Sequence, residues 1–483
     1  MAASPCIFVI FGGTGDLSRR KLLPALARNM AEGHIGDRFG VVAAGRSDKP
    51  DESFRETVLE SLADAGIGGE EARRLAERTH YQVVGQGTED DYRTLGRRLA
   101  EVGRAYDIPP NHGFYMSLPP SAFGPTAAGL GAVGLNESAG WTRVVVEKPF
   151  GTSLATAQAL NEELHRYYTE DQIYRIDHYL GKETVQNLLV LRLANALIES
   201  NWNRDRISSV QITVSEDLGV GTRAEYYDRA GAIRDMVQNH LTQILTLVAM
   251  EVPSSFDADA IRNEKIKVLR SLRPPRGENV VRGRYTAGDI GGKEVVGYLD
   301  EQGIAADSKT ETFAAFRMFV DSWRWQGVPF YLRTGKRMPH KTTQIAVRFR
   351  AAPVSYFKQM GCSHDLNGVL TITLQPDESF ALYFDIKRPG SPLALERIPL
   401  RFSYGEHFAE ELPDAYETLL LDVIEGDQTL FVHGEEVEES WRLYSPLLDN
   451  PTPIYDYPAG TWGPPEAEGF AIPEFESCLR NDT

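Results

Sequence analysis

Cysteine, long apolar runs and positive charge are all scarce in this chain. The only cysteines are Cys6, Cys362 and Cys478, and their spacing matches neither a disulfide framework nor a zinc site. No stretch approaches the ~18–20 apolar residues that a membrane-spanning helix needs. The apolar run Cys6–Phe11 is too short for a secretion signal, and no basic residues precede it. We therefore expect a cytoplasmic protein that holds no metal.

Acidic residues outnumber basic ones, which gives a formal net charge of -17. This charge argues against nucleic acid or an anionic membrane as the partner. Any small anionic ligand must be held by local Lys, Arg and His side chains against the overall field. The 483 residues and the 42% hydrophobic content are typical of a globular protein with two domains.

The first part of the chain alternates apolar strands with helical segments. The run Ile7–Phe11 stops at Gly12, and leucines and alanines recur at helical spacing from Leu17 to Met30. Strands alternating with helices predict a doubly wound parallel sheet of the Rossmann type. Further strands are predicted at Phe39–Ala44, His80–Val84, Gly113–Leu118 and Thr142–Glu147.

Beyond about residue 177 the pattern changes to long helices mixed with alternating strands. We predict a Rossmann domain at 1–177 and a domain with a large mixed or antiparallel sheet and helices at 178–483, hence α/β plus α+β. The segment Pro451–Pro465 reads as an irregular tail. The helices are predicted at Thr184–Ile198 and Ala232–Glu251, and the strands at Ser209–Ser215, Pro329–Leu332, Gln344–Phe349, Val369–Leu374 and Phe380–Phe384.

A glycine-rich turn connects the first strand to the first helix. Gly12, Gly13 and Gly15 let backbone N–H groups approach a pyrophosphate at the helix N-terminus, with Thr14, Asp16 and Leu17 beside them. The spacing G-x-x-G is shorter than the full dinucleotide fingerprint. A glycine turn that binds no nucleotide therefore stays open as the alternative.

The ends of two later strands add cofactor candidates. Arg46 stands where an NAD-binding unit commonly carries an acid, and an arginine accommodates a 2′-phosphate. NADP is therefore the expected cofactor, with NAD use left open; Lys21 and Thr14 are candidates to assist, and a solvated arginine is the alternative. Lys148 ends another strand, where the ligands of open sheets bind, and Pro149 after it permits a cis peptide bond.

The segment RIDHYLGKE places four polar side chains around one glycine. Asp177, His178, Tyr179 and Lys182 together match the needs of a phosphate monoester, because charged donors make the strongest hydrogen bonds to it. The alternative is a polar helix start with a solvated lysine.

Histidine 240 is the candidate general base. His240 and Asp235 lie five residues apart in a predicted α-helix, about 140° around its axis, so they are expected to flank one ligand rather than touch. Histidine suits proton abstraction near neutral pH, and Asp177 is a candidate to orient it. A structural histidine remains the alternative. Glu216 follows the predicted strand Ser209–Ser215, where a carboxylate can accept from sugar hydroxyls, whereas Lys336 and Lys341 lie in a turn after Pro329–Leu332 that by itself resembles a solvated loop.

Taken together, these motifs resemble the glucose-6-phosphate dehydrogenase family over nearly the whole chain. RIDHYLGKE is the most specific of them. The motifs occur in the family's order: GGTGDLSRRKLLPAL, AGRS, YMSLPP, VVVEKPFG, RIDHYLGKE, IRDMVQNHLTQ, VPFYLRTGKRMP and YPAGTWGP. Two positions depart from the family's pattern, GGTGDL in place of GASGDL and Lys341 in place of a frequent arginine.

The resemblance implies oxidation of glucose 6-phosphate at C1 to 6-phosphogluconolactone with reduction of NADP, the first step of the oxidative pentose phosphate pathway. It implies a homodimer or homotetramer whose interface is built by the second domain's sheet. His240 is implied as the base and Asp177 as its partner. Substrate contacts are implied for His178, Tyr179, Lys182, Glu216, Asp235, Lys336, Lys341 and Lys148, and cofactor contacts for Lys148, Arg46 and Tyr115.

Two other functions remain as alternatives. A sugar oxidoreductase of the glucose–fructose type also has a Rossmann domain and an E-K-P strand end, but it is not expected to carry RIDHYLGKE. A redox-inactive NADP-binding sensor is the other, and the retention of His240, Asp177 and the phosphate cluster disfavours it.

Overall fold

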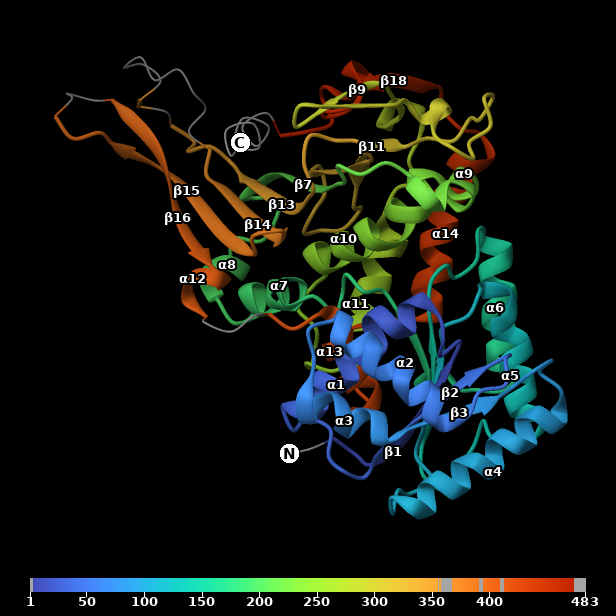
Figure 1. The fold of residues 1–483 in the computed structure, drawn as a ribbon. Helices are drawn as coiled ribbons and strands as arrows, with labels where there is room; N and C mark the ends of the chain where they lie inside the picture. Colours follow the sequence, from blue (N-terminus) through green and yellow to red (C-terminus); the bar gives the residue numbers. More distant parts are fainter. Residues whose placement is uncertain (1–2, 355, 358–366, 391–393, 409–411, 473–483) are drawn as a thin grey trace. The chain divides into compact units, whose positions relative to one another are not determined.

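The computed structural model describes residues 3–354, 356–357, 367–390, 394–408 and 412–472, which form two compact units (Figure 1). The first unit combines Met1–Lys182 with Ser254–Arg262 and Pro413–Glu438. The second contains Glu183–Pro253, Asn263–Leu412 and Glu439–Thr483. Within the described ranges, no helix has the length and apolar character needed to cross a bilayer.

The first unit is built on a seven-stranded sheet in the order β17-β6-β5-β4-β1-β2-β3. All neighbouring pairs are parallel except β17 with β6, so six strands follow the Rossmann order 3-2-1-4-5-6. The predicted parallel doubly wound sheet is confirmed. The strands are β1 Cys6–Phe11, β2 Phe39–Gly45, β3 Thr79–Val83, β4 His112–Met116, β5 Thr142–Val146, β6 Ile173–Ile176 and β17 Phe431–Val432.

Both faces of this sheet are covered by helices, which explains why its central strand is apolar at every position. Cys6, Phe8 and Ile10 pack into the core formed with α1, α2, α3 and α13, whereas Ile7 and Val9 pack into the core on the opposite face, formed with α4 and α5. The helices are α1 Leu23–Ala31, α2 Asp51–Asp64, α3 Gly69–Glu77, α4 Glu89–Ala105, α5 Phe123–Ala132, α6 Leu154–His165 and α13 Ala415–Glu425, with short turns at Pro120–Ala122 and Glu170–Gln172.

The second unit is built on a nine-stranded mixed sheet in the order β16-β15-β14-β13-β7-β12-β11-β8-β18. Only β12 with β7 and β18 with β8 are parallel, which confirms the predicted mixed sheet. The strands are β7 Ile207–Ser215, β8 Val280–Thr286, β11 Phe313–Phe319, β12 Pro329–Gly335, β13 Thr342–Phe349, β14 Val369–Gln375, β15 Ser379–Lys387, β16 Leu395–Ser403 and β18 Ile454–Pro458, with a separate hairpin of β9 Gly288–Ile290 and β10 Lys293–Val295.

The second unit's helices are shorter than the sequence predicts. They are α7 Glu183–Leu193, α8 Ala196–Glu199, α9 Ala224–Ala232, α10 Thr242–Ala249 and α12 Tyr404–His407, with short turns at Gly221–Arg223, Gly277–Asn279, Tyr298–Asp300 and Pro465–Ala467. Two further helices, α11 Ala258–Ser271 and α14 Gly434–Asp449, contain residues of both units. The predicted helix Thr184–Ile198 is interrupted at Asn195, which is extended and whose amide donates to the Leu191 carbonyl oxygen at 3.1 Å.

Two predicted α-helices begin with a π-helical segment instead. The helix expected from Leu17 starts as a π-helix at Ser18–Leu22, and the one expected from Ala232 starts as a π-helix at Ile233–Leu241. In a π-helix the hydrogen bonds run from residue i to i+5, a winding that apolar periodicity does not reveal. The prediction of a continuous α-helix was therefore wrong at both places.

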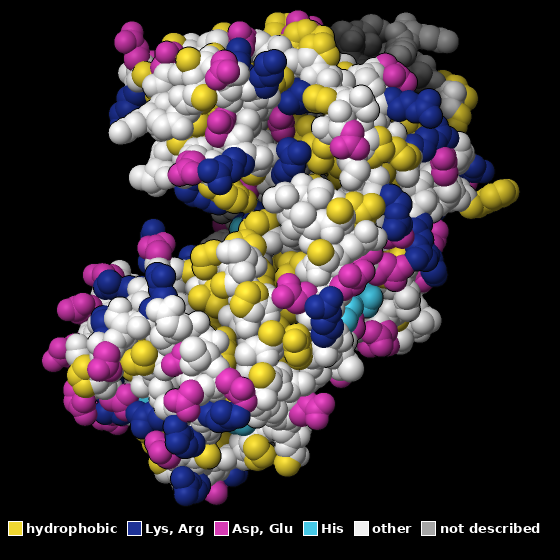
Figure 2. All heavy atoms as spheres, turned by 90° about the vertical axis from the view of Figure 1, so that its right-hand side faces the viewer, with side chains coloured by type: hydrophobic (Ala, Val, Ile, Leu, Met, Phe, Trp, Pro, Cys, Tyr) yellow, Lys and Arg dark blue, Asp and Glu magenta, His cyan; other side chains and the backbone are white. Residues whose placement is uncertain are grey.

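The predicted irregular tail contains a strand. Ile454–Pro458 forms β18 at the edge of the nine-stranded sheet, parallel to β8. Prolines at 453 and 458 obscure the strand in the sequence, but an edge strand tolerates them. Figure 2 shows acidic and basic side chains interspersed over the face in view, so the acidic excess does not gather there in one patch.

Candidate active site

The glycine turn follows β1 directly, at the point where strand order reverses between β1 and β4. Gly12 has a φ of 76°, and a Cβ there would lie 2.1 Å from the Ser117 carbonyl oxygen. A Cβ on Gly13 would lie 2.5 Å from the Ala43 Cβ. Only glycine fits at these two positions, and the missing side chains let a ligand approach the backbone.

The remaining residues of the turn lead into the first helix. The Gly15 N–H donates to the Gly12 carbonyl oxygen at 2.8 Å, and Thr14 is exposed. The Asp16 side chain is 82% exposed, whereas Leu17 packs against the core. Lys21 Nζ lies 2.6 Å from the carboxylate of Asp414, the N-cap residue of α13, so an acid already pairs with this candidate cation.

Arg46 is exposed immediately after β2, the parallel neighbour of β1. The glycine turn and Arg46 therefore lie at the carboxyl ends of adjacent strands, where a dinucleotide crosses such a sheet. The close approach that Gly12 and Gly13 allow, next to the start of the first helix, fits the pyrophosphate of a nicotinamide dinucleotide.

Lys148 follows β5, and its peptide bond to Pro149 is cis. Its neighbour Glu147 accepts hydrogen bonds from the Tyr115 hydroxyl at 2.5 Å and the Tyr416 hydroxyl at 3.1 Å. Burial raises the pKa of Glu147, even though both hydroxyls and Lys148 act in the opposite direction. Tyr115 is fully buried and its hydroxyl donates to Glu147, so a role for Tyr115 in cofactor binding would act through that carboxylate.

Sequence reasoning assigned no role to Glu147 or Tyr416. The motif E-K-P marks Glu147, but nothing in the sequence pairs it with a tyrosine 269 residues further along the chain.

The loop after β6 carries the three predicted phosphate ligands, His178, Tyr179 and Lys182, together with Asp177, the predicted partner of the base. Asp177 is 2% exposed, and its Oδ1 accepts the Tyr179 N–H at 3.0 Å. Lys182 Nζ lies 4.8 Å from the centre of the Tyr179 ring, and the His178 ring lies 5.0 Å from that ring. A Cβ on Gly181 would lie 2.7 Å from the Leu419 Cγ of α13, so this helix fixes the loop from behind.

In the second unit, three predicted ligands share one edge of the large sheet. Gly335, the last residue of β12, and Thr342, the first of β13, both pair with Ser215 at the end of β7. Glu216 directly follows Ser215, Lys336 directly follows Gly335, and Lys341 directly precedes Thr342. Lys336 Nζ donates to Glu216 Oε2 at 2.7 Å, and Lys341 is exposed.

The π-helix Ile233–Leu241 carries both Asp235 and His240. Residues five apart come nearly above one another in a π-helix, so the two side chains start from the same side of it. The predicted 140° separation was wrong because it assumed α-helical winding. His240 is 1% exposed, and Asp235 is 8% exposed and accepts the Tyr226 hydroxyl at 3.3 Å.

Tyr227 neighbours Lys336 and interacts electrostatically with Asp235 and Glu216, and the sequence analysis assigned no role to it. Lys336 Nζ lies 4.9 Å from the centre of its ring. Burial raises the pKa of Tyr227, and the neighbouring carboxylates of Asp235 and Glu216 raise it further. The electrostatic effect places both acids close to this phenol.

Comparison with known proteins supplies the family. A model of the NAD binding domain of glucose-6-phosphate dehydrogenase matches residues 9–187, and a model of that family's C-terminal domain matches residues 189–474. The chain belongs to the glucose-6-phosphate dehydrogenase family. Membership disfavours the alternative of a glucose–fructose type oxidoreductase.

Curated relatives and solved structures of the family align over almost the full length. Glucose-6-phosphate 1-dehydrogenase of Aggregatibacter actinomycetemcomitans is 43% identical, covering 97% of this chain and 96% of the relative. That of Bacillus subtilis is 42% identical, covering 96% of each. A solved glucose-6-phosphate dehydrogenase in complex with its substrate glucose-6-phosphate is 34% identical, covers 97% of each chain and has a TM-score of 0.90. The Mycobacterium avium enzyme, also 34% identical and covering 97% of each chain, has a TM-score of 0.83.

Proposed function

We propose that this protein oxidises glucose 6-phosphate at C1 to 6-phosphogluconolactone and passes the hydride to NADP, as in the first step of the oxidative pentose phosphate pathway. The observation that carries the proposal is the match of both family models, which together span residues 9–187 and 189–474. A solved relative that covers 97% of this chain holds glucose-6-phosphate as its substrate.

The loop that contains Asp177–Lys182 is proposed to hold the phosphate group. His178, Tyr179 and Lys182 offer an imidazole, a phenol and an ammonium group within one turn. Because the whole chain carries a net charge of -17, these local donors must overcome an unfavourable field. The position of Lys182 over the Tyr179 ring limits its freedom and lowers the entropy lost on binding.

Glu216, Asp235, Lys336 and Lys341 are proposed to bind the sugar hydroxyls or the phosphate. The ion pair of Lys336 with Glu216 fixes both side chains before a ligand arrives. A carboxylate accepts from hydroxyl groups and an ammonium donates to them, so the pair can distinguish a sugar from an apolar ligand.

His240 is proposed to take the proton of the C1 hydroxyl group. Asp177 is proposed to pair with the imidazole and stabilise its protonated form. The Tyr179 N–H already holds one Asp177 oxygen, which restricts how this carboxylate turns. NADP, when bound, supplies the acceptor for the hydride that leaves C1.

Arg46 and the glycine turn are proposed to bind the adenosine half of NADP, and Lys148 to contact both substrate and cofactor. Use of NAD as a second cofactor remains part of the proposal, because the glycine turn serves both dinucleotides. A cytoplasmic location also remains a prediction.

A homodimer or homotetramer is expected. Exposed apolar side chains on β15 and β16 support this, since water is excluded from such a surface when two copies pair. They are Phe384, Ile386, Ile398 and Leu400, which are 44%, 43%, 39% and 68% exposed.

The variant His240→Asn tests the proposed base. Loss of general-base catalysis typically costs ~10²–10⁴-fold in turnover, so kcat should fall by about that factor. The dissociation constant for glucose 6-phosphate, measured by calorimetry, should change only a few-fold. His34→Asn, on an exposed histidine, is the matched control. Turnover near the wild-type value in His240→Asn would show that another group is the base.

A further inference from the structure

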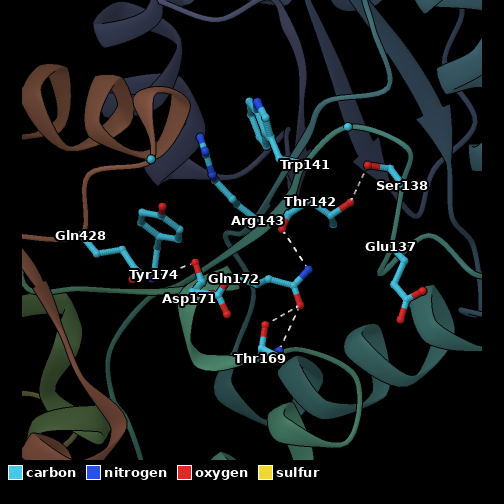
Figure 3. A pocket seen from close by; sticks show the side chains of 12 residues that line it. Glu137, Ser138, Trp141, Thr142, Arg143, Thr169, Asp171, Gln172, Tyr174 and Gln428 are labelled. Atoms are coloured by element: carbon cyan, nitrogen blue, oxygen red, sulfur yellow. Dashed lines mark hydrogen bonds between the residues drawn. The ribbon is translucent and has the colours of Figure 1, made fainter. Parts of the chain in front are cut away.

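A cavity in the first unit lies at the opposite end of the parallel strands from the glycine turn. A cavity of about 580 Å³ lies where β5 and β6 begin, lined by Thr142 and Arg143 of β5, by Tyr174 of β6 and by Gly426 after α13 (Figure 3). The dinucleotide residues follow the carboxyl ends of parallel strands, whereas this cavity lies at their amino ends. The two sites are therefore separate.

Arg143 supplies a fixed positive charge to the cavity wall. Its Nη1 donates to the carbonyl oxygens of Val423 and Ile424, both at 2.7 Å. Its guanidinium lies 4.0 Å from the centre of the Trp141 ring. No carboxylate among the described residues forms an ion pair with it. The guanidinium is held in place and keeps donors for an anionic group.

Tyr174 adds a hydroxyl group that can reach the cavity beside this cation. The residue is 1% exposed, yet its hydroxyl makes no hydrogen bond to any residue in the described ranges. Burial raises its pKa to about 12, and Arg143 lowers it, which places the two groups close together. Figure 3 shows both side chains lining the cavity. The hydroxyl oxygen is not among the fully enclosed unpartnered atoms of the described residues, so it keeps access to the cavity and can donate to a ligand there.

The amides that line the cavity are already satisfied. Gln172 Nε2 donates to the carbonyl oxygens of Asn136 at 3.2 Å and Thr142 at 3.1 Å. Gln428 Nε2 donates to three backbone carbonyl oxygens, including that of Ile173 at 3.1 Å. These contacts make the lining rigid and leave recognition to the charged groups and Tyr174.

Two exposed acids complete the lining. Asp171 and Glu137 line the cavity, and neither forms an ion pair with a residue that the structure describes. Asp171 and Tyr174 line the same cavity, and the pKa of Tyr174 is lowered by Arg262 as well as by Arg143 and raised to a lesser extent by Asp427 and Asp171. The cavity thus presents one unpaired cation and unpaired carboxylates within one small volume.

We propose that this cavity binds a free α-amino acid as a zwitterion. The carboxylate accepts from the Arg143 guanidinium and the Tyr174 hydroxyl, and the ammonium group donates to Asp171. A phosphate dianion fits less well, because the lining sets a single arginine, Arg143, against the carboxylates of Asp171 and Glu137. A volume of about 580 Å³ accommodates a metabolite of this size.

Binding is tested on the full-length protein, independently of its activity. Mixtures of the standard α-amino acids are screened by saturation-transfer NMR, and those that bind are titrated by calorimetry. Tyr174→Phe should weaken binding by about ten-fold or more, since one hydrogen bond to a charged group is lost. Asp171→Asn should also weaken it. Without ligand, Tyr174→Phe should melt no lower than the wild type, because no hydrogen bond within the protein is lost.

Tyr168→Phe is the matched control. Tyr168 is also a buried tyrosine, and its enclosed hydroxyl has no hydrogen-bond partner among the described residues; because it does not line the cavity, its removal should leave binding unchanged. The proposal is overturned if no amino acid binds, or if Tyr174→Phe and Asp171→Asn bind like the wild type. Acetate or inorganic phosphate binding as tightly as the amino acid also overturns it, because the ammonium group would then contribute nothing.

Discussion

Removing the charge of Glu170 should destabilise the first unit strongly at neutral pH. Glu170 Oε1 lies 2.6 Å from Arg175 Nη1 and accepts the Gly434 N–H at 2.8 Å. Burial alone would raise the pKa of Glu170, but the pair with Arg175, these hydrogen bonds and His433 outweigh it and lower the pKa to about 2. Lowering this pKa from its ordinary 4.5 to about 2 corresponds to ~3 kcal/mol of stabilisation of the ionised form.

The expected change is a loss of about 3 kcal/mol in the free energy of unfolding for Glu170→Gln at pH 7. The estimate agrees with the ~3–5 kcal/mol that breaking a buried pair costs, since Arg175 is only 1% exposed and loses its charge partner. Because the pKa is lowered on folding, the stabilisation is present above pH 4.5 and disappears as pH falls towards 2. The difference between wild type and variant should therefore shrink over that range.

Urea unfolding followed by tryptophan fluorescence at a series of pH values measures this difference. Glu89→Gln is the matched control, because Glu89 pairs with Arg93 at 52% and 60% side-chain exposure. Such surface pairs contribute ~0–1 kcal/mol. Equal losses for the two variants at pH 7, or a loss for Glu170→Gln that does not change with pH, would refute the reasoning.

Variants at three further positions test the candidate sites. Arg46→Ala should raise KM for NADP more than KM for NAD in steady-state assays, and equal losses would contradict the 2′-phosphate contact. Lys182→Ala should raise KM for glucose 6-phosphate by about 10–100-fold, since a charge-assisted hydrogen bond is lost; an unchanged preference over glucose would count against the phosphate assignment. Glu147→Ala should lower the melting temperature more than Glu147→Gln, because only the glutamine keeps an acceptor for the Tyr115 and Tyr416 hydroxyls; equal melting temperatures would exclude that role.

Elements with strong periodicity were predictable from the sequence. The strands β1, β2 and β7 lie within one or two residues of their predicted bounds, because the ends of an apolar run in the sequence mark the ends of a buried strand. The π-helical winding of Ile233–Leu241 was not predictable, since π-helical segments are rare and the sequence carries no signal that separates i→i+5 from i→i+4 hydrogen bonding. Strand β17 has only two residues, and pairs with β6 through contacts far apart in the sequence.

Site residues that are neighbours in the sequence were predicted together, whereas contacts between residues far apart in the sequence were not. The loop Asp177–Lys182 is continuous in sequence, so its four polar groups were found together. Glu216 and Lys336 meet because β7 and β12 are parallel neighbours, which follows from the register and not from spacing. Tyr416 reaches Glu147 from a segment that returns to the first unit, and no local pattern indicates that return.

The most direct test of the proposed reaction follows the hydrogen atom at C1. Glucose 6-phosphate deuterated at C1 is incubated with the protein and NADP, and the reduced cofactor is analysed by mass spectrometry. Direct hydride transfer predicts one deuterium in each reduced cofactor, formed together with the lactone. Reduced cofactor without deuterium, or no reduction with either NADP or NAD, would contradict oxidation of this sugar at C1.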